Sequence, residues 1–427
     1  MIILAGADLV LPDRVLGHGT LVIDDGRIAD IAEGPRPIEA PLTEGAYRDL
    51  RDCLVLPGFI DGHVHGLLGV DTLDGDDAIE AIARALPRFG VTAFCPTSVA
   101  CGPAALARML AAIGRARATP PAHAARVLPA HLESNFVNPL WAGAQPRSCL
   151  RPPPGAPPGP DAAAGARGAA AFSAEDILDV IDAARADVGI VTLAPELPGA
   201  LDLVATLASR GHRVSLGHSG ASFDEATAAM QAGARQVTHL YNRMSPAGHR
   251  EPGLAGAALH HHDLAVEIVC DGLHVHPAMV RVTVAAKQPS RVMAITDGTA
   301  GSGLAPGARA SLGGRPITVR DAAYLDDGTL AGSVLTMDRA FAFLTGPVGL
   351  SVVDAAHLCA TTPARELGLQ GHGVLAPGAV ADLVVLDRRL QVVETFVAGH
   401  RVWARQEAPE GPEPGGTGRD GRPSMRL

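Results

Sequence analysis

The middle of this chain alternates between apolar strand patterns and helical patterns about eight times, and no other feature limits its possible folds as strongly. The predicted strands are Leu54 to Ile60, Val91 to Pro96, Arg126 to Ala130, Val188 to Leu193, Arg213 to Leu216, Gln236 to His239, Ala265 to Val269 and Arg291 to Ile295. The predicted helices include Asp77 to Phe89, Pro103 to Ala118, Ala174 to Ala186, Leu197 to Arg210 and Ser222 to Ala232. Strands that are apolar on both faces and alternate with helices form parallel sheets covered on each side. Eight such units favour a (β/α)8 TIM-type barrel of the α/β class. A doubly wound open sheet is the alternative, but no G-x-G-x-x-G follows an early strand.

Both ends of the chain carry a different pattern, of short strands separated by turns. Asp24-Asp25-Gly26-Arg27 is a hairpin signal, because Asp-Gly readily adopts positive φ. Residues 372–404 show the same pattern of short strands and turns. We therefore predict a small β-sandwich domain formed from both termini, residues 1–55 and 372–405, around a barrel domain of residues 56–371. The proline-rich stretch 151–168 is predicted to be a surface loop, and residues 406–427 a disordered tail.

Composition excludes several classes of protein and of partner. Hydrophobic residues make up 47% of the 427 residues and charged residues 19%, which is typical of a globular protein. The net charge of −10 argues against a nucleic-acid partner, which needs a basic surface. No apolar run approaches the ~18 residues of a membrane span, and Met1-Ile2-Ile3-Leu4 has no basic lead, so we expect a cytoplasmic protein. The six cysteines form no C-x-x-C pair, so a cysteine-based zinc site is not expected.

Polar residues cluster where the predicted strands end. His63 and His65 alternate with Val64, so the period of two sends both imidazoles in one direction. Other strand ends carry further histidines and carboxylates: Glu133, His218, His239 and Asp297. Barrel active sites are built at the carboxyl ends of the strands, and imidazole suits zinc and similar first-row metals. The sequence therefore predicts a metal site at the mouth of the barrel, where the carboxyl ends of the strands meet.

The chain resembles the N-acetylglucosamine-6-phosphate deacetylases, a family of the amidohydrolase superfamily, over nearly its whole length. The matching motifs lie at 57–66, 131–133, 136–139, 191–196, 217–219, 239–242, 250–253, 271–277, 295–297 and 330–333. The resemblance implies a (β/α)8 barrel with a small β-sandwich, usually a homodimer, that hydrolyses a linear amide C–N bond. The implied partner is a small-molecule N-acetylated amino sugar phosphate, cleaved to glucosamine 6-phosphate and acetate.

The resemblance also implies roles for residues at the mouth. Glu133, His218 and His239 match the common metal ligands, and His63 and His65 match members that bind a second ion. One or two divalent ions are therefore expected, most simply zinc, with iron, manganese or cobalt as alternatives. Asp297 matches the acid/base that works with metal-bound hydroxide. Many superfamily relatives use a carbamylated lysine, but the only lysine here lies far downstream.

Substrate contacts follow in the same way. Asn242 and Arg250 match residues near the sugar phosphate, with Arg250 reaching across a dimer interface, since a guanidinium binds phosphate well. Residues that would line the sugar are His274, Leu330, Ala331 and Gly332. The chain departs from the family in two places, because the usual Gly-Ala-His is Gly143-Ala144-Gln145 and the usual Asn-Ala-Met is Asn242-Arg243-Met244.

These departures leave other functions open. One is deacetylation of a different N-acyl amino sugar, such as N-acetylgalactosamine 6-phosphate. Another is a related amidohydrolase reaction on a non-phosphorylated N-acyl amine. A non-catalytic scaffold would have no reason to keep all six metal-site residues.

Overall fold

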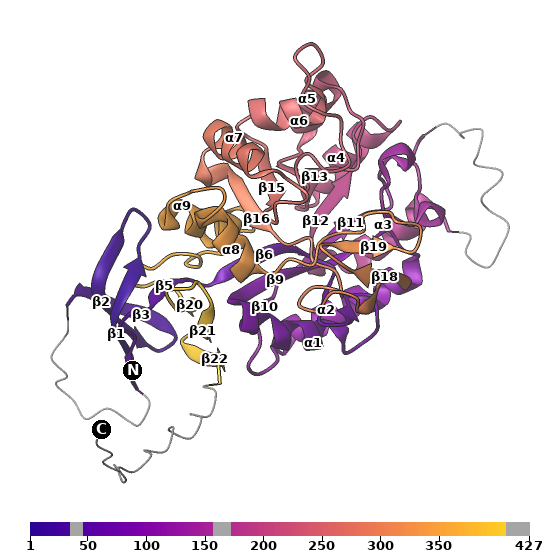
Figure 1. Ribbon diagram of the computed structural model, residues 1–427. Helices are drawn as coiled ribbons and strands as arrows, with labels where there is room; N and C mark the ends of the chain where they lie inside the picture. The colour runs from indigo at the N-terminus through magenta and orange to yellow at the C-terminus, as the bar shows by residue number, and fades with distance from the viewer. Residues whose placement is uncertain (35–45, 157–171, 407–427) are drawn as a thin grey trace, which may run out of the picture.

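The computed structural model describes residues 1–34, 46–156 and 172–406. Figure 1 shows a barrel with a separate sheet beside it, which contains strands from both ends of the chain. The predicted disordered tail lies outside the described residues except for Gln406, and so does most of the proline-rich stretch. Among the described residues, we find no helix with the length and apolar character that a membrane crossing requires.

The barrel strands are parallel and follow one another around the sheet in chain order. They are β6 (Phe59–Val64), β9 (Val91–Ser98), β10 (Arg126–Val127) with β11 (Ala130–Glu133), β12 (Val188–Leu193), β13 (Arg213–Leu216), β14 (Gln236–Val237), β15 (Ala265–Val269) and β16 (Val292–Ile295). The third strand is in two pieces, β10 and β11, on either side of Leu128 and Pro129. A parallel bridge between Val64 and Gly298 joins the last strand to the first. The predicted (β/α)8 barrel is confirmed.

Helices surround the barrel strands (Figure 1). They are α1 (Ala78–Ala85), α2 (Pro103–Ala118), α3 (Ala174–Ala183), α4 (Ala200–Ser209), α5 (Phe223–Ala232), α6 (Gly253–His260), α7 (Pro277–Lys287), α8 (Met337–Thr345), α9 (Val352–Ala356) and α10 (Thr362–Glu366). Local chemistry explains several starts. Pro103 opens α2 at a position where its missing N–H costs nothing, and Ser222 caps α5 by accepting from the Glu225 N–H. These starts agree with the sequence predictions.

The two faces of the barrel strands bury different side chains. Outward-facing residues such as Leu132, Val191 and Leu216 pack against the helices in the main hydrophobic core. A small apolar cluster inside the barrel contains Ile60, Ala93, Cys95, Leu128, Ile190 and Ala364. Further polar side chains are also buried, among them Asp61, His131, Thr192, Gln236 and Glu267. The barrel interior therefore has a small apolar cluster together with a large buried polar group.

The second sheet has the order β22-β21-β20-β5-β1-β2-β3, with β4 paired to β1. Its strands are β1 (Ile2–Val10), β2 (Val15–Asp24), β3 (Arg27–Glu33), β4 (Tyr47–Asp49), β5 (Leu54–Pro57), β20 (Leu383–Leu386), β21 (Val392–Val397) and β22 (His400–Ala404). The single strand predicted from Leu54 to Ile60 is wrong, because β5 belongs to this sheet and β6 to the barrel. The chain passes between them at Gly58, where an added Cβ would lie 2.2 Å from Thr92 Cγ2. Only glycine fits so close a backbone approach.

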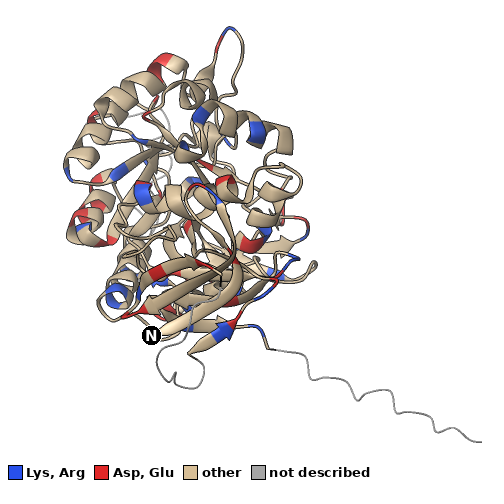
Figure 2. Ribbon diagram, turned by 90° about the vertical axis from the view of Figure 1, so that its left-hand side faces the viewer, with Lys and Arg blue, Asp and Glu red and all other residues tan. Residues whose placement is uncertain are grey.

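Two small sheets complete the described structure. One pairs β7 (Gly66–Leu67) with β8 (Val70–Asp71), and the other contains β17 (Arg309–Leu312), β18 (Arg315–Val319) and β19 (Ala323–Leu325). The second follows the last barrel strand and leads into residues 330–332, which line the cavity described below. Basic and acidic residues are interspersed over the ribbon in Figure 2.

Candidate active site

Three side chains from three strand ends meet at the mouth of the barrel. Glu133 ends β11, His218 follows β13, and His239 follows β14. Glu133 Oε1 lies 2.7 Å from His218 Nε2 and 2.8 Å from His239 Nε2. The two Nε2 atoms lie 3.2 Å apart, and all three residues are buried. These ligand atoms could all contact one cation.

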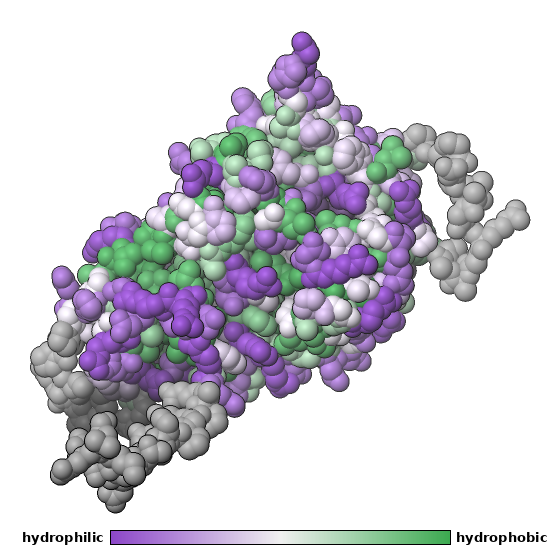
Figure 3. All heavy atoms as spheres, in the orientation of Figure 1, coloured by the Kyte–Doolittle hydropathy of each residue, from purple (hydrophilic) through white to green (hydrophobic). Residues whose placement is uncertain are grey.

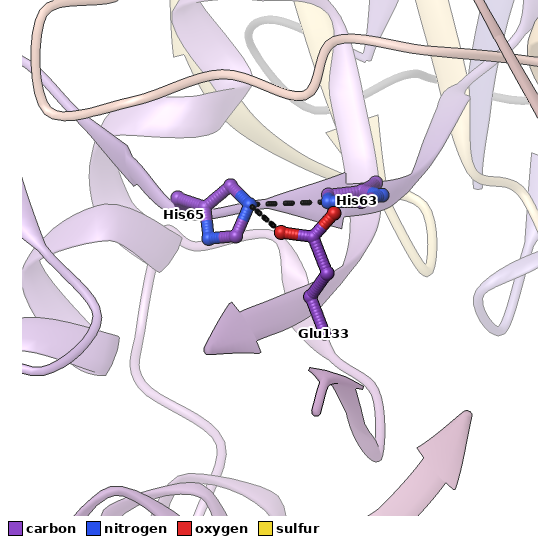
Figure 4. Close-up of side chains that lie close together, drawn as sticks. All are labelled: His63, His65 and Glu133. Atoms are coloured by element: carbon purple, nitrogen blue, oxygen red, sulfur yellow. Dashed lines mark hydrogen bonds and ion pairs between the residues drawn. The ribbon is translucent and has the colours of Figure 1, made fainter. Parts of the chain in front are cut away.

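His63 and His65 form a second group beside the first. Their Nε2 atoms lie 3.1 Å apart, and His65 Nε2 lies 3.5 Å from Glu133 Oε2 (Figure 4). Asp297 Oδ1 lies 3.4 Å from His63 Nε2 and 3.3 Å from His65 Nε2. The structure thus brings together all six residues predicted for the metal site and the acid/base. Glu133 faces both groups, one through each oxygen.

Unusual backbone conformations aim three of these side chains. His218, His239 and Asp297 have φ values of 47°, 31° and 47°, in the left-handed region that non-glycine residues seldom adopt. Such strain concentrates at functional sites, where the surrounding structure holds it in place. His218 Nδ1 donates to the Trp141 carbonyl at 2.9 Å, which directs Nε2 toward Glu133. The sharp turn at each strand end therefore directs the side chain to the mouth.

The electrostatics of the group favour a positive charge. Burial opposes charge on His65, but contacts with Asp297 and Glu133 outweigh it and raise the pKa of His65 to about 10. Burial also opposes charge on His239, but the hydrogen bond to Glu133 and its negative charge outweigh it and raise the pKa of His239 to about 9. Burial would raise the pKa of Glu133, but His218 beside it holds that pKa well below its usual range. Without a metal, protons supply the positive charge that the carboxylates require.

The donor set fits a first-row divalent ion. Ligands about 2.0–2.1 Å from a tetrahedral zinc lie about 3.3 Å from one another. The observed Nε2 separations of 3.1 Å and 3.2 Å match this spacing. Imidazole nitrogens and a carboxylate are also the ligand types that zinc, iron, manganese and cobalt accept. The residues present therefore fit the ion or ions predicted from the sequence.

The predicted substrate residues line one cavity with the metal-site residues. Its lining contains His65, Glu133, His218, His239, Asp297, Ala144, Gln145, Asn242, Arg243, His274, Leu330, Ala331 and Gly332. Arg250 lies elsewhere, on the exposed loop 246–251 between β14 and α6. This loop forms the hydrophilic tip at the top of Figures 1 and 3. Within one subunit, the structure does not bring Arg250 to the cavity.

Two lining residues have fixed orientations. Gln145 is buried, donates from Nε2 to Glu133 Oε2, and accepts the Ala100 N–H at 2.7 Å. His274 Nδ1 donates its proton to the Asp271 carboxylate at 2.6 Å, so Nε2 is free to accept a hydrogen bond. Gln145 is thus tied to a proposed metal ligand, whereas His274 has one nitrogen available to a substrate.

Arg243 is a third residue of the cavity lining, and its environment differs from those of Gln145 and His274. It packs over Gly143, whose added Cβ would lie 2.8 Å from Arg243 Nε. Among the described residues, its guanidinium makes no hydrogen bond or ion pair with a carboxylate. An unpaired cation at the cavity rim is available to an anionic group of a ligand.

Sequence reasoning missed a polar layer beneath the mouth. Asp61 Oδ2 accepts from Thr296 Oγ1 at 2.6 Å, next to Asp297, and its Oδ1 accepts the His63 N–H at 3.2 Å. Glu267 lies 3.1 Å from His63 Nδ1. The sequence did contain one signal for Glu267, because this carboxylate interrupts the otherwise apolar run Ala265 to Val269. A charged residue in a buried strand needs polar partners in the interior.

Comparison with known proteins identifies the class. A model of the amidohydrolase family matches residues 54–402. The chain therefore belongs to the amidohydrolase family, whose members are metal-dependent hydrolases, and it is a hydrolase of an amide C–N bond.

More specific relatives are deacetylases of amino sugar phosphates. The N-acetylglucosamine-6-phosphate deacetylase of Bacillus subtilis is 32% identical over 405 residues, which are 94% of this chain and 96% of that protein. The N-acetylgalactosamine-6-phosphate deacetylase of Escherichia coli O157:H7 is 33% identical, over 93% of this chain and 98% of that one. A structure of the Mycobacterium smegmatis N-acetyl-D-glucosamine-6-phosphate deacetylase, a variant in complex with N-acetyl-D-glucosamine-6-phosphate, matches with a TM-score of 0.82. It is 32% identical and covers 94% of this chain and 99% of that chain.

Proposed function

We propose that this protein deacetylates N-acetylglucosamine 6-phosphate to glucosamine 6-phosphate and acetate. One observation carries the proposal: four of the five metal-site residues (His65, Glu133, His218 and His239), Asp297 and the free guanidinium of Arg243 all line one cavity. A deacetylase of a phosphorylated sugar needs these three functions within reach of one small molecule. The deacetylases among its relatives support the same reaction.

The proposed acid/base step belongs to Asp297. Glu133, His218 and His239 would hold one ion, and His63 and His65 would hold a second with Glu133. A bound divalent ion lowers the pKa of water to about 7 and polarises a carbonyl oxygen. Asp297 Oδ1 accepts the proton of the attacking water and then delivers it to the amide nitrogen, which leaves poorly unless protonated.

Other residues bind and orient the sugar. His274, fixed through Nδ1 by Asp271, offers Nε2 to a polar group of the substrate. Asn242 donates from Nδ2 to the His239 and Leu240 carbonyls at 3.3 Å, which holds its oxygen toward the cavity. Arg243 contacts the phosphate from the rim. Residues 330–332 cover the sugar from the loop after β19.

The finer features of the enzyme are also proposed. Zinc suits the histidine and carboxylate donors best, with iron, manganese and cobalt as substitutes. A homodimer would give the exposed loop 246–251 a role, because Arg250 of one subunit could reach the cavity of the other. All six cysteines are free, which suits the reducing cytoplasm.

The proposal is tested by acetate release from three sugars. Zinc-loaded enzyme is assayed with N-acetylglucosamine 6-phosphate, N-acetylgalactosamine 6-phosphate and unphosphorylated N-acetylglucosamine. We expect the first to give the highest kcat/KM and the plain sugar to lose at least 100-fold. Equal rates on plain and phosphorylated sugars would contradict a phosphate site and leave an amidohydrolase of another N-acyl amine.

A second candidate substrate is N-acetylgalactosamine 6-phosphate. Arg243 and Gln145 replace the residues usual in the glucosamine family, and a galactosamine enzyme is among the relatives. Both replacements lie in the cavity lining. The two epimers differ only at one hydroxyl. The three-sugar assay compares kcat/KM for both and so shows which epimer the cavity prefers.

A further inference from the structure

Glu267 is a buried carboxylate that the proposed mechanism does not use. It lies in the middle of β15 and is only 1% exposed. Its Oε2 lies 3.1 Å from His63 Nδ1, and its Oε1 accepts from Gln236 Nε2 at 2.7 Å. A buried carboxylate is costly unless its oxygens are well partnered, so a stable position here requires these hydrogen bonds.

The partners of Glu267 continue away from the mouth. Gln236 Oε1 accepts from Arg213 Nε at 2.6 Å, and Arg213 pairs with Glu366. Glu366 also accepts from Arg291 at 3.1 Å. Gln236, held in turn by Arg213, donates to Oε1 of Glu267, so Oε2 faces His63, where it also accepts the His239 N–H at 3.4 Å.

A separate cation site at this place does not fit. Ligand atoms of His63, His131 and Glu267 lie close enough to meet one ion. However, His131 Nδ1 donates to the Gly62 carbonyl at 3.1 Å, and its Nε2 lies 2.8 Å from Thr192 Oγ1. Both nitrogens of His131 are therefore occupied, and the cluster is held by hydrogen bonds.

We infer that Glu267 is a positioning residue that fixes the tautomer and orientation of His63. The carboxylate accepts the Nδ1 proton, so the Nε2 lone pair of His63 faces His65 and Asp297. In the other tautomer, a lone pair would face the carboxylate and a proton would occupy the ligand position. This inference rests on the metal site of the proposed function, and it makes the His63–His65 ion depend on Glu267.

The test is metal titration of the metal-free full-length protein with Zn²⁺, without any substrate. Glu267→Gln preserves shape, but its amide sets an N–H against either His63 or Gln236. We expect wild type to bind two ions and Glu267→Gln to lose 10- to 100-fold in affinity for one, which is the usual effect of losing such a partner. Affinity for the ion at Glu133, His218 and His239 should change by less than about threefold.

Three further variants separate positioning from general destabilisation. Glu366→Gln disturbs the far end of the same chain and touches no histidine, so it should lower Tm but leave both affinities unchanged. In a His63→Ala background, Glu267→Gln should have no further effect on the remaining ion. Gln236→Met removes the hydrogen bond to Glu267 Oε1 and should lower the affinity for the His63–His65 ion about fivefold. This variant tests the inference if Glu267→Gln fails to fold.

Several results would overturn the inference. They are a single ion in wild type, an unchanged second affinity in Glu267→Gln, or equal losses at both sites. The deacetylase assay is independent of this titration. If the titration behaves as expected but no sugar is hydrolysed, only the proposed function fails.

Discussion

Replacing Asp297 with asparagine tests the proposed acid/base directly. Asp297 has a φ of 47°, and asparagine tolerates the left-handed region nearly as well as aspartate. Its carbonyl also accepts the Ser333 N–H at 2.9 Å, and this contact does not depend on the side chain. Asp297→Asn therefore keeps backbone and shape, but its amide neither accepts nor delivers the required proton.

The structure sets the expected size of the loss. General acid–base catalysis contributes about 10²- to 10⁴-fold, or about 3 to 5 kcal/mol of barrier. Glu133 is the other carboxylate of the cavity lining, and its oxygens already contact His218, His239 and Gln145. Because no free carboxylate of the lining can replace Asp297, we expect kcat to fall by about 10³-fold or more.

The pH profile gives a second readout. Burial would raise the pKa of Asp297, but His63 and then His65 outweigh it and hold that pKa below the ordinary 3.8. Because this pKa is lowered, Asp297 is ionised at neutral pH, and its protonation should reduce kcat only on the acid side of the ordinary carboxyl range. An acid limb centred above the ordinary carboxyl range would have to come from another group.

The assay is acetate release by zinc-loaded enzyme, with metal content and Tm measured on the same samples. Asp326→Asn is the matched control, since Asp326 pairs with Arg309 on the surface, and its kcat should stay within about twofold. A kcat of Asp297→Asn within tenfold of wild type at full metal content would refute the reasoning. Loss of metal together with activity would instead make Asp297 a ligand.

Four further outcomes are expected. Glu133→Ala should lose metal and activity together while circular dichroism shows an intact fold, and full metal content would remove Glu133 from the site. The pKa values of His65 and His239 are raised to about 10 and 9, so each ion should displace about one proton at pH 7.5. Calorimetry should therefore show that metal affinity rises about tenfold per pH unit, and a flat profile from pH 6 to 8 would contradict this. Arg243→Ala should cost about 10- to 100-fold in kcat/KM for the phosphorylated sugar and almost nothing for the plain sugar, so equal losses would exclude a phosphate contact. Co-expressing Arg250→Ala with Asp297→Asn should restore activity in mixed dimers if Arg250 acts across the interface, whereas no restoration would exclude that role.

The sequence by itself determined the elements whose signals are local. Helix α2 runs from Pro103 to Ala118 as predicted, because proline at the first position and the apolar periodicity lie within one segment. The capping box of Ser222 and Glu225 likewise marks the start of α5. His63 and His65 could be predicted to point together from their spacing alone, since side chains alternate along a strand.

The tertiary structure decided whatever depends on which surface a segment meets. The run Leu54 to Ile60 reads as one apolar strand, but it divides at Gly58, because a separate sheet and the barrel each bury one half. Glu267 lies in a strand that is buried on both faces, and periodicity does not say which face is the barrel interior. Gln145 reaches Glu133 from a loop, and no pattern in the chain indicates that contact. Such pairings come from barrel closure, which joins segments that local sequence signals cannot relate.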